Sequence, residues 1–182
     1  SVNLPVFCWF PGPRFLLHPD ALHVSKSLEQ RVRSGRFDVR LDTAFEEVIQ
    51  GCARAPRPDD AGTWITPEMI DAYGELHRLG YAHCAESWLD GELVGGLYGV
   101  SLGGIFFGES MFHRVADASK VAFVLLVRQL VKWGFGLVDC QLETAHLARF
   151  GAVDMPRRRF LHELRGLLDR PNRAGPWRFD PA

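Results

Sequence analysis

The segment 118–133 limits most strongly how this chain can fold. It contains neither Gly nor Pro, and its charged side chains, Lys120, Arg128 and Lys132, fall on one stripe of a helix. Most of the remaining residues are apolar, so a helix here has to bury most of its circumference. We therefore predict a nearly buried helix that packs across a β-sheet.

Strand patterns flank this helix on both sides. Segments 82–89 and 93–100 surround Asp90-Gly91, a pair that favours the tight turn of a β-hairpin, and a third strand follows at 105–111. Another apolar strand, 137–141, comes after the helix. This order predicts an α/β (α+β) fold with a mixed, largely antiparallel sheet flanked by helices.

Capping residues indicate where three other helices begin. Ser27 with Gln30, and Thr43 with Glu46, match the capping box, in which side chains satisfy the first backbone amides of a helix. Thr66 precedes a proline, the residue favoured at the first helical position. Further strands are predicted at 14–17 and 36–41, and a last helix at 157–168.

Length and composition suit one domain, with or without a small appendage. The 182 residues carry a net charge of -1, so nucleic-acid binding would depend on local basic patches. The four cysteines form no CxxC pair, which is typical of reduced thiols in the cytoplasm. The longest apolar run, 121–127, is too short to span a membrane. We expect a cytoplasmic protein with no membrane contact.

The strand 137–141 is the candidate reaction site. Successive strand side chains point to opposite faces, so Asp139 and Gln141 share a face and Cys140 points away. An acid beside an amide at the end of a buried strand could perform chemistry. The structural alternative is that Asp139 caps the following helix and Gln141 lies on a solvated rim. Cys140 as a nucleophile would need a histidine on its own face, and buried cysteines are often inert.

Other chemistry finds little support. Ser110 lacks the second glycine of a nucleophile elbow. Of the possible ligands His77, His83 and Cys84, only His83 and Cys84 are adjacent, and they lie on opposite strand faces, so we do not expect a shared metal ion. The sequence contains no phosphate-binding G-x-x-x-x-G-K-[ST] loop. We expect neither a metal nor a cofactor.

Two residue groups could contact a substrate. Basic residues cluster at 26–40 and again at 157–159, either as solvated helix faces or as a surface for a phosphate backbone. The first cluster includes Lys26, Arg31, Arg33, Arg36 and Arg40. An apolar stripe beside the Asp139 strand is either plain core or a side-chain pocket. It consists of Leu97, Phe106, Met111, Phe123, Leu126, Leu130 and Val138.

Four collinear segments together resemble the leucyl/phenylalanyl-tRNA–protein transferase family. They are Gly62-Thr63-Trp64-Ile65-Thr66, Glu92-Leu93-Val94-Gly95-Gly96-Leu97-Tyr98-Gly99-Val100, Phe107-Gly108-Glu109-Ser110-Met111-Phe112 with Ala118-Ser119-Lys120, and Asp139-Cys140-Gln141 with Gly151-Ala152 and Pro156-Arg157-Arg158 downstream. No single motif is decisive, but their order and spacing match from about Phe10 to Leu168, most of the chain.

The resemblance implies a function and a domain organisation. Such enzymes move Leu or Phe, and Met less well, from aminoacyl-tRNA to the N-terminal Arg or Lys of a protein, which marks that protein for degradation. It also implies a GNAT-like acyltransferase domain behind a smaller N-terminal domain. We expect an extended arm at 1–19 as the remnant of that domain, the transferase domain at 20–170, and a C-terminal tail at 171–182.

The resemblance assigns roles to matching residues. Asp139 and Gln141 occupy the positions of the family's catalytic pair, and Glu109 that of a substrate-binding acid. Trp64 is expected near the acceptor end of the tRNA, and the apolar stripe matches the pocket for the transferred side chain. Thr144 departs from the pattern, since an Asn is expected there.

The N-terminal region also departs from the family. From the resemblance we expect this chain to carry only a remnant of the family's N-terminal domain, with Cys8 in place of a usual Trp and Gly12 in place of an acid. The shortened platform places tRNA affinity in doubt more than the chemistry. Two other functions stay open at this point: a CoA-dependent N-acetyltransferase, although no pyrophosphate-binding loop precedes the Lys120 helix, and a non-catalytic relative that has kept the pocket.

Overall fold

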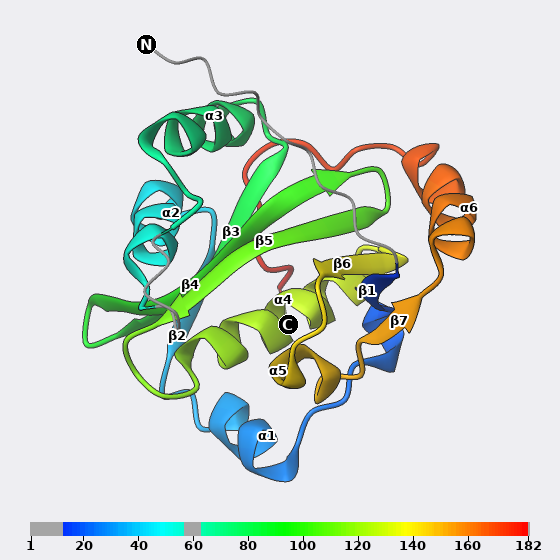
Figure 1. Ribbon diagram of the computed structural model, residues 1–182. Helices are drawn as coiled ribbons and strands as arrows, with labels where there is room; N and C mark the ends of the chain where they lie inside the picture. Colours follow the sequence, from blue (N-terminus) through cyan, green and yellow to red (C-terminus); the bar gives the residue numbers. More distant parts are fainter. Residues whose placement is uncertain (1–12, 57–62, 182) are drawn as a thin grey trace.

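A computed structural model describes residues 13–56 and 63–181, and its strands form one mixed sheet in the order β2-β3-β4-β5-β6-β1-β7 (Figure 1). Neighbouring strands are antiparallel except β5 and β6, which are parallel. The predicted α/β class with a largely antiparallel sheet is thus confirmed. The expectations for Cys8, Gly12 and most of the arm lie outside the described residues, as does Gly62.

The strands agree well with the sequence patterns. They are β1 (Arg14–Leu17), β2 (Asp38–Leu41), β3 (Ala82–Leu89), β4 (Glu92–Leu102), β5 (Ile105–His113), β6 (Leu137–Gln141) and β7 (Val153–Met155). Asp90 and Gly91 both have positive φ, at 53° and 81°, as the predicted hairpin turn requires. The sequence analysis missed β7, which has only three residues and depends on pairing with β1.

The helices cover both faces of the sheet. They are the 3₁₀ helix η1 (Pro19–Ala21) and the α-helices α1 (Lys26–Arg33), α2 (Phe45–Arg54), α3 (Pro67–Arg78), α4 (Ala118–Lys132), α5 (Ala145–Ala148) and α6 (Arg157–Leu168). Helix α4 packs across the sheet as predicted, and its Val124, Val127 and Leu130 are fully buried. Figure 1 shows α2 and α3 near one end of the sheet and α6 near the other.

Alternating strand residues enter different parts of the core. Phe106 packs into the cluster that contains α4, whereas its neighbour Phe107 packs beside the cluster that contains Phe160 of α6. Tyr98 belongs to a third cluster, which contains Val48 of α2. The sheet therefore separates α4 on one face from α2 and α6 on the other.

Two predicted helix caps are wrong. Ser25, not Ser27, accepts the backbone amide of Leu28 at the start of α1. Thr43 does not cap α2, because its backbone amide donates to buried Glu86 at 2.6 Å and its hydroxyl also donates to that carboxylate. Glu86 of β3 thus accepts the backbone amides of Thr43 and Ala44 just before α2, in place of a local capping side chain. Thr66 caps α3 as predicted.

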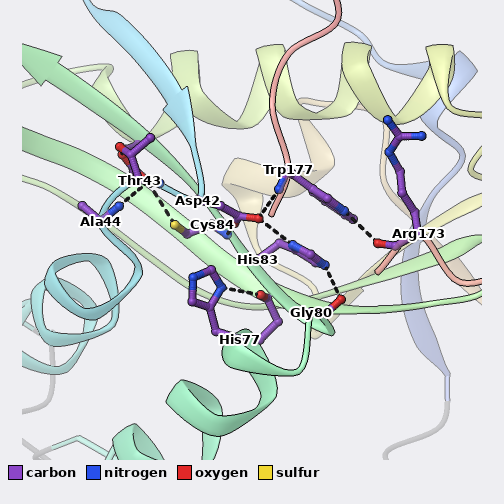
Figure 2. A network of polar contacts seen from close by, with 11 residues as sticks. Asp42, Thr43, Ala44, His77, Gly80, His83, Cys84, Arg173 and Trp177 are labelled. Atoms are coloured by element: carbon purple, nitrogen blue, oxygen red, sulfur yellow. Dashed lines mark hydrogen bonds and ion pairs between the residues drawn. The ribbon is translucent and has the colours of Figure 1, made fainter. Parts of the chain in front are cut away.

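The segment after α6 returns to the face of the sheet covered by α4 (Figure 2). The Trp177 backbone amide donates to Asp42 Oδ2 at 2.6 Å, and the same oxygen lies 2.8 Å from His83 Nδ1. The Trp177 indole stacks on the His83 imidazole at 3.7 Å between ring centroids and is only 2% exposed. Residues near the C-terminus therefore complete the core.

Candidate functional site

The candidate site lies where the pairing of β5 and β6 ends. The two strands pair only through Ile105–Phe107 and Leu137–Asp139, although β5 continues to His113 and β6 to Gln141. Beyond this pairing the two strands diverge. The Gln141 side chain of β6 crosses the gap between them and donates to the Gly108 carbonyl of β5. This is the site predicted from the Asp139 strand.

Asp139 is fully buried and is held by Arg14 from the first position of β1. Arg14 Nε donates to both carboxylate oxygens, at 2.9 Å and 2.8 Å. Burial raises the pKa of Asp139, and the Arg14 guanidinium opposes that shift. The alternative that Asp139 caps the next helix is wrong, because Thr144 accepts the Leu147 amide at 3.2 Å and is the cap of α5.

Gln141 is positioned by a turn rather than by strand alternation alone. Its φ of 65° lies in the left-handed region, and its backbone amide donates to Asp139 Oδ1 at 2.8 Å. Its side-chain nitrogen donates to the Gly108 carbonyl at 3.0 Å and to Glu109 Oε2 at 3.1 Å. Because a carbonyl can only accept, this geometry fixes the orientation of the amide. The side-chain oxygen receives no hydrogen bond from the described residues.

Glu109 is the extra residue of a β-bulge. Tyr98 pairs with Ser110 and Gly99 with Gly108, which leaves Glu109 without an opposite residue on β4. Regular strand alternation would place Phe107, Glu109 and Met111 on one face of the sheet, and the bulge breaks this alternation. Phe107 packs on the α6 side of the sheet, whereas Met111 packs on the α4 side.

Glu109 finds its partners across the site. It accepts hydrogen bonds from Gln141 and from Tyr73 of α3, and burial raises its pKa above the ordinary value. Burial and the neighbouring Glu109 also raise the pKa of Tyr73. Glu109 forms no ion pair with another described residue. Lys120 binds Asp117 at 2.9 Å, and Arg114 donates to the Leu93 carbonyl.

An apolar cavity of about 300 Å³ adjoins these polar groups. Four residues of the predicted stripe line it, namely Leu97, Phe106, Met111 and Phe123. The other three, Leu126, Leu130 and Val138, are buried in the adjoining core and do not line the cavity. The sequence analysis did not assign the remaining lining residues Gly108, Ser110, Cys140, His146 and Leu147 to the pocket.

Cys140 and Thr144 both border the cavity. Burial and the nearby Asp139 raise the pKa of the Cys140 thiol to about 12, so the thiolate is scarce at neutral pH. Cys140 is therefore a lining residue with poor nucleophilic character. Strand alternation predicted that it points away from Asp139, but both residues border the same cavity. Thr144 combines two roles, because it caps α5 and also lines the cavity.

The remaining candidate residues lie on exposed surface. Trp64 is 43% exposed, which leaves its indole accessible to a ligand. Lys26, Arg33 and Arg36 are exposed on or beside α1, but Arg33 binds Glu29 at 2.9 Å. Arg31 lies 3.8 Å from Asp117, so acidic neighbours compensate part of this basic cluster.

Arg14 and Tyr73 are site residues that the sequence analysis missed. Arg14 did leave a signal, because it begins an otherwise apolar strand, Arg-Phe-Leu-Leu. A buried arginine requires an acidic partner, which directs attention to the acids of neighbouring strands. Tyr73 left no comparable signal, since its contact with Glu109 depends on how α3 packs against the bulge.

A family model described as "Leucyl/phenylalanyl-tRNA protein transferase" matches residues 16–165, which include the end of β1, the bulge and the Asp139 turn. The chain belongs to this family. A protein named leucyl/phenylalanyl-tRNA–protein transferase from Nitratidesulfovibrio vulgaris strain DP4 is 58% identical over 174 residues, 96% of this chain and 74% of that one. One with the same name from Myxococcus xanthus is 56% identical over 173 residues, 95% of this chain and 74% of its own length.

Membership of the leucyl/phenylalanyl-tRNA–protein transferase family confirms the predicted enzyme class, an aminoacyltransferase. It favours this activity over the CoA-dependent alternative. A crystal structure of a protein of unknown function from Staphylococcus epidermidis supports the fold alone. Its TM-score is 0.53 at 10% sequence identity, and the match covers 79% of this chain and 57% of that protein.

The described residues contain neither a membrane-spanning helix nor a metal-binding cluster. Within residues 13–56 and 63–181, no helix has the length and apolar character needed to cross a lipid bilayer. The same residues contain no cluster of three or more His, Cys, Asp or Glu side chains that could hold a metal ion.

Proposed function

We propose that this protein transfers Leu or Phe, and Met less well, from aminoacyl-tRNA to the N-terminal Arg or Lys of acceptor proteins in the cytoplasm, marking them for degradation. The observation that carries the proposal is an apolar cavity bordered by Asp139 and Glu109, with Gln141 directly beside it. An apolar side chain gains by leaving water for such a cavity, whereas a charged one would lose its hydration.

The chemistry requires positioning more than a strong base. The aminoacyl ester is already activated, and an α-amine with a pKa of about 7.7–8.0 is partly neutral at pH 7. Holding amine and ester together can supply up to about 7–11 kcal/mol of the barrier. The Gln141 side-chain oxygen can accept a hydrogen bond from the amine, because its nitrogen is already fixed by Gly108 and Glu109. The ester carbonyl is attacked, and the ribose oxygen leaves with a proton.

Acidic groups at the site favour a cationic acceptor. Glu109 is partly buried beside apolar residues, where a carboxylate is costly unless a cation pairs with it. The acceptor Arg or Lys and the ammonium of the transferred residue are the cations that the substrates offer. We assign Glu109 to recognition of the acceptor side chain.

The tRNA requires a surface beyond the reaction site. We assign its acceptor end to Trp64, whose exposed indole can stack on a base, and its phosphate backbone to Lys26, Arg31, Arg33 and Arg36. Residues 1–19 form the arm, 20–170 the GNAT-like transferase domain and 171–182 the C-terminal segment in this proposal.

One experiment tests the proposed function directly. Phe-tRNA charged with labelled Phe is incubated with matched acceptor proteins that begin with Arg, Lys or Ala. We expect label on the first two and little on the third. A matched incubation with labelled acetyl-CoA tests the alternative donor. Acetylation without Phe transfer would overturn the proposal in favour of a CoA-dependent enzyme.

A further inference from the structure

We propose that Arg14 is a positioning residue for aminoacyl transfer, acting through Asp139 to hold Gln141 beside the cavity. The inference rests on the proposed function. It assigns a role to a residue from the N-terminal arm, 125 positions away from Asp139 in the sequence. The strand β1 would thus complete the reaction site.

A continuous series of contacts connects Arg14 to the cavity. Arg14 is 9% exposed, and its Nε donates to both oxygens of fully buried Asp139. Asp139 Oδ1 also accepts the Gln141 backbone amide at 2.8 Å. Gln141 then donates its side-chain nitrogen to Glu109 at 3.1 Å. Each link fixes the geometry of the next.

The left-handed turn at Gln141 depends on the charge of Asp139. A non-glycine residue in this region is strained and persists only when its surroundings hold it there. The Asp139 carboxylate does so by accepting the amide two residues further on, as in an Asx turn. Without the Arg14 guanidinium, a fully buried carboxylate would favour its protonated form, and its hold on the turn would weaken.

Stability alone is a poor explanation for this ion pair. A buried salt bridge often contributes no more to stability than well-packed apolar side chains would, because both charges lose their hydration. Here the ion pair holds Gln141 through its backbone amide, and Gln141 is the residue whose side-chain oxygen we assign to the attacking amine. Its position matters there, since a misplacement of about 1 Å can slow a reaction about a hundredfold.

Steady-state transfer to a short Arg-initiated peptide tests the proposal in Arg14→Met and Arg14→Lys. We expect kcat to fall about a hundredfold in Arg14→Met and less in Arg14→Lys, while KM for Phe-tRNA changes less than about twofold. Arg54→Met is the matched control, because Arg54 is exposed at the end of α2 and donates only to Gln50 among the described residues. It should retain wild-type kinetics.

Four further measurements separate positioning from general damage. The acidic limb of the pH profile of kcat should move to higher pH in Arg14→Met. Without the Arg14 guanidinium, nothing offsets the effect of burial and of the neighbouring carboxylate, so the pKa values of Asp139 and Glu109 rise. Methylguanidinium should restore activity to Arg14→Ala saturably, whereas methylammonium at equal ionic strength should not. The double variant Arg14→Met/Asp139→Asn should be little slower than Asp139→Asn alone, because the effects of substitutions in residues that act as one unit do not add. The Gln141 side-chain amide resonances should shift in Arg14→Met but not in Arg54→Met.

The outcomes distinguish this inference from the proposed function. If wild type does not transfer Phe, the proposed function fails and this inference falls with it. If wild type transfers Phe but Arg14→Met keeps its kcat and pH profile, only the role of Arg14 is overturned. A rate loss that matches the unfolded fraction, with no rescue by methylguanidinium, would show a structural role instead.

Discussion

Gln141 donates its side-chain amide nitrogen to Glu109 Oε2 at 3.1 Å across the gap between β6 and β5. The contact joins an amide, which we assign to the attacking amine, to a carboxylate, which we assign to the acceptor side chain. The side-chain nitrogen also donates to the Gly108 carbonyl, so the amide oxygen points away from both of these acceptors. The following experiments test these assignments one at a time.

The first prediction concerns the Asp139 turn. Asp139→Ala and Gln141→Ala should each reduce transfer at least about tenfold, because each removes a group that orients the reactants. Single-turnover transfer from Phe-tRNA measures the effect, and circular dichroism checks the fold. Cys140→Ala, at the position between the two, serves as the control and should reduce the transfer rate only slightly. Near-wild-type rates in both variants would remove the turn from the mechanism.

The second prediction is the pH dependence of transfer. Burial raises the pKa of both Asp139 and Glu109, so their ionised forms are lost at a higher pH than for ordinary carboxyl groups. Transfer should therefore decline as the pH falls through this raised range. A rate profile with saturating substrates measures the decline. A profile that falls with pH only as protonation of the attacking α-amine requires, with no further loss above about pH 4, would contradict the assignment.

Stability should respond to Glu109 in the opposite direction. Because its folded-state pKa is raised, the folded protein retains a proton that the unfolded chain has already released. The contribution of Glu109 to the free energy of unfolding should fall as the pH rises from its unfolded to its folded pKa. Chemical denaturation of wild type and Glu109→Gln at several pH values isolates this contribution. A difference that does not vary with pH would argue against a raised pKa.

The third prediction concerns acceptor choice. Glu109→Gln should weaken the preference for Arg or Lys over Ala, because a charge-assisted hydrogen bond of about 1.5–3 kcal/mol is lost. Competition among matched acceptors, with Phe-tRNA held saturating, measures the preference. Tyr73→Phe removes only the hydroxyl contact to Glu109 and should have a smaller effect. A variant that keeps the full preference would assign Glu109 to the ester substrate or to the fold.

The fourth prediction locates the tRNA backbone. Charge reversal of Arg31, Arg33 and Arg36 should weaken tRNA binding and flatten its dependence on salt by about 0.7–0.9 logarithmic units per lost phosphate contact. Filter binding over a range of salt concentrations measures the slope. The exposed arginines Arg157 and Arg158 at the start of α6 provide the comparison surface. If only their reversal changes the slope, the tRNA lies along α6.

The fifth prediction concerns the C-terminal segment. Trp177→Ala should destabilise the protein by about 3–5 kcal/mol, because it empties a buried site against His83 and removes the indole contact to Trp133 at the end of α4. Trp64→Ala is the matched control and should change stability little, since Trp64 is 43% exposed. Urea denaturation compares the two variants. Equal stability losses would show that the stack contributes nothing specific.

Local patterns were sufficient for the elements that form the frame of the site. The Asp90-Gly91 turn and the apolar helix α4 have short-range causes, namely backbone conformation and amphipathic character. The bounds of β6 were predicted to the residue for the same reason. These features do not depend on knowing which distant segments meet.

The contacts that organise the site depend on distant segments and could not be predicted in this way. The bulge at Glu109 needs the register of β4, and the Arg14–Asp139 pair needs β1 to lie beside β6. Thr43 shows the same effect at the start of a helix, because the Glu86 carboxylate of β3 accepts hydrogen bonds from its backbone amide and hydroxyl. In each case a tertiary partner replaces the local one that the pattern suggested.

The bulge has a consequence for how this protein can vary. Phe106 and Met111 are five positions apart, yet both pack on the α4 side of the sheet, which regular alternation would forbid. The extra residue Glu109 corrects the alternation between them. Exchanging its side chain would alter the chemistry and leave the strand intact, whereas deleting its codon would turn every later residue of β5 to the wrong face. At this position evolution can explore substitutions but not a change of length.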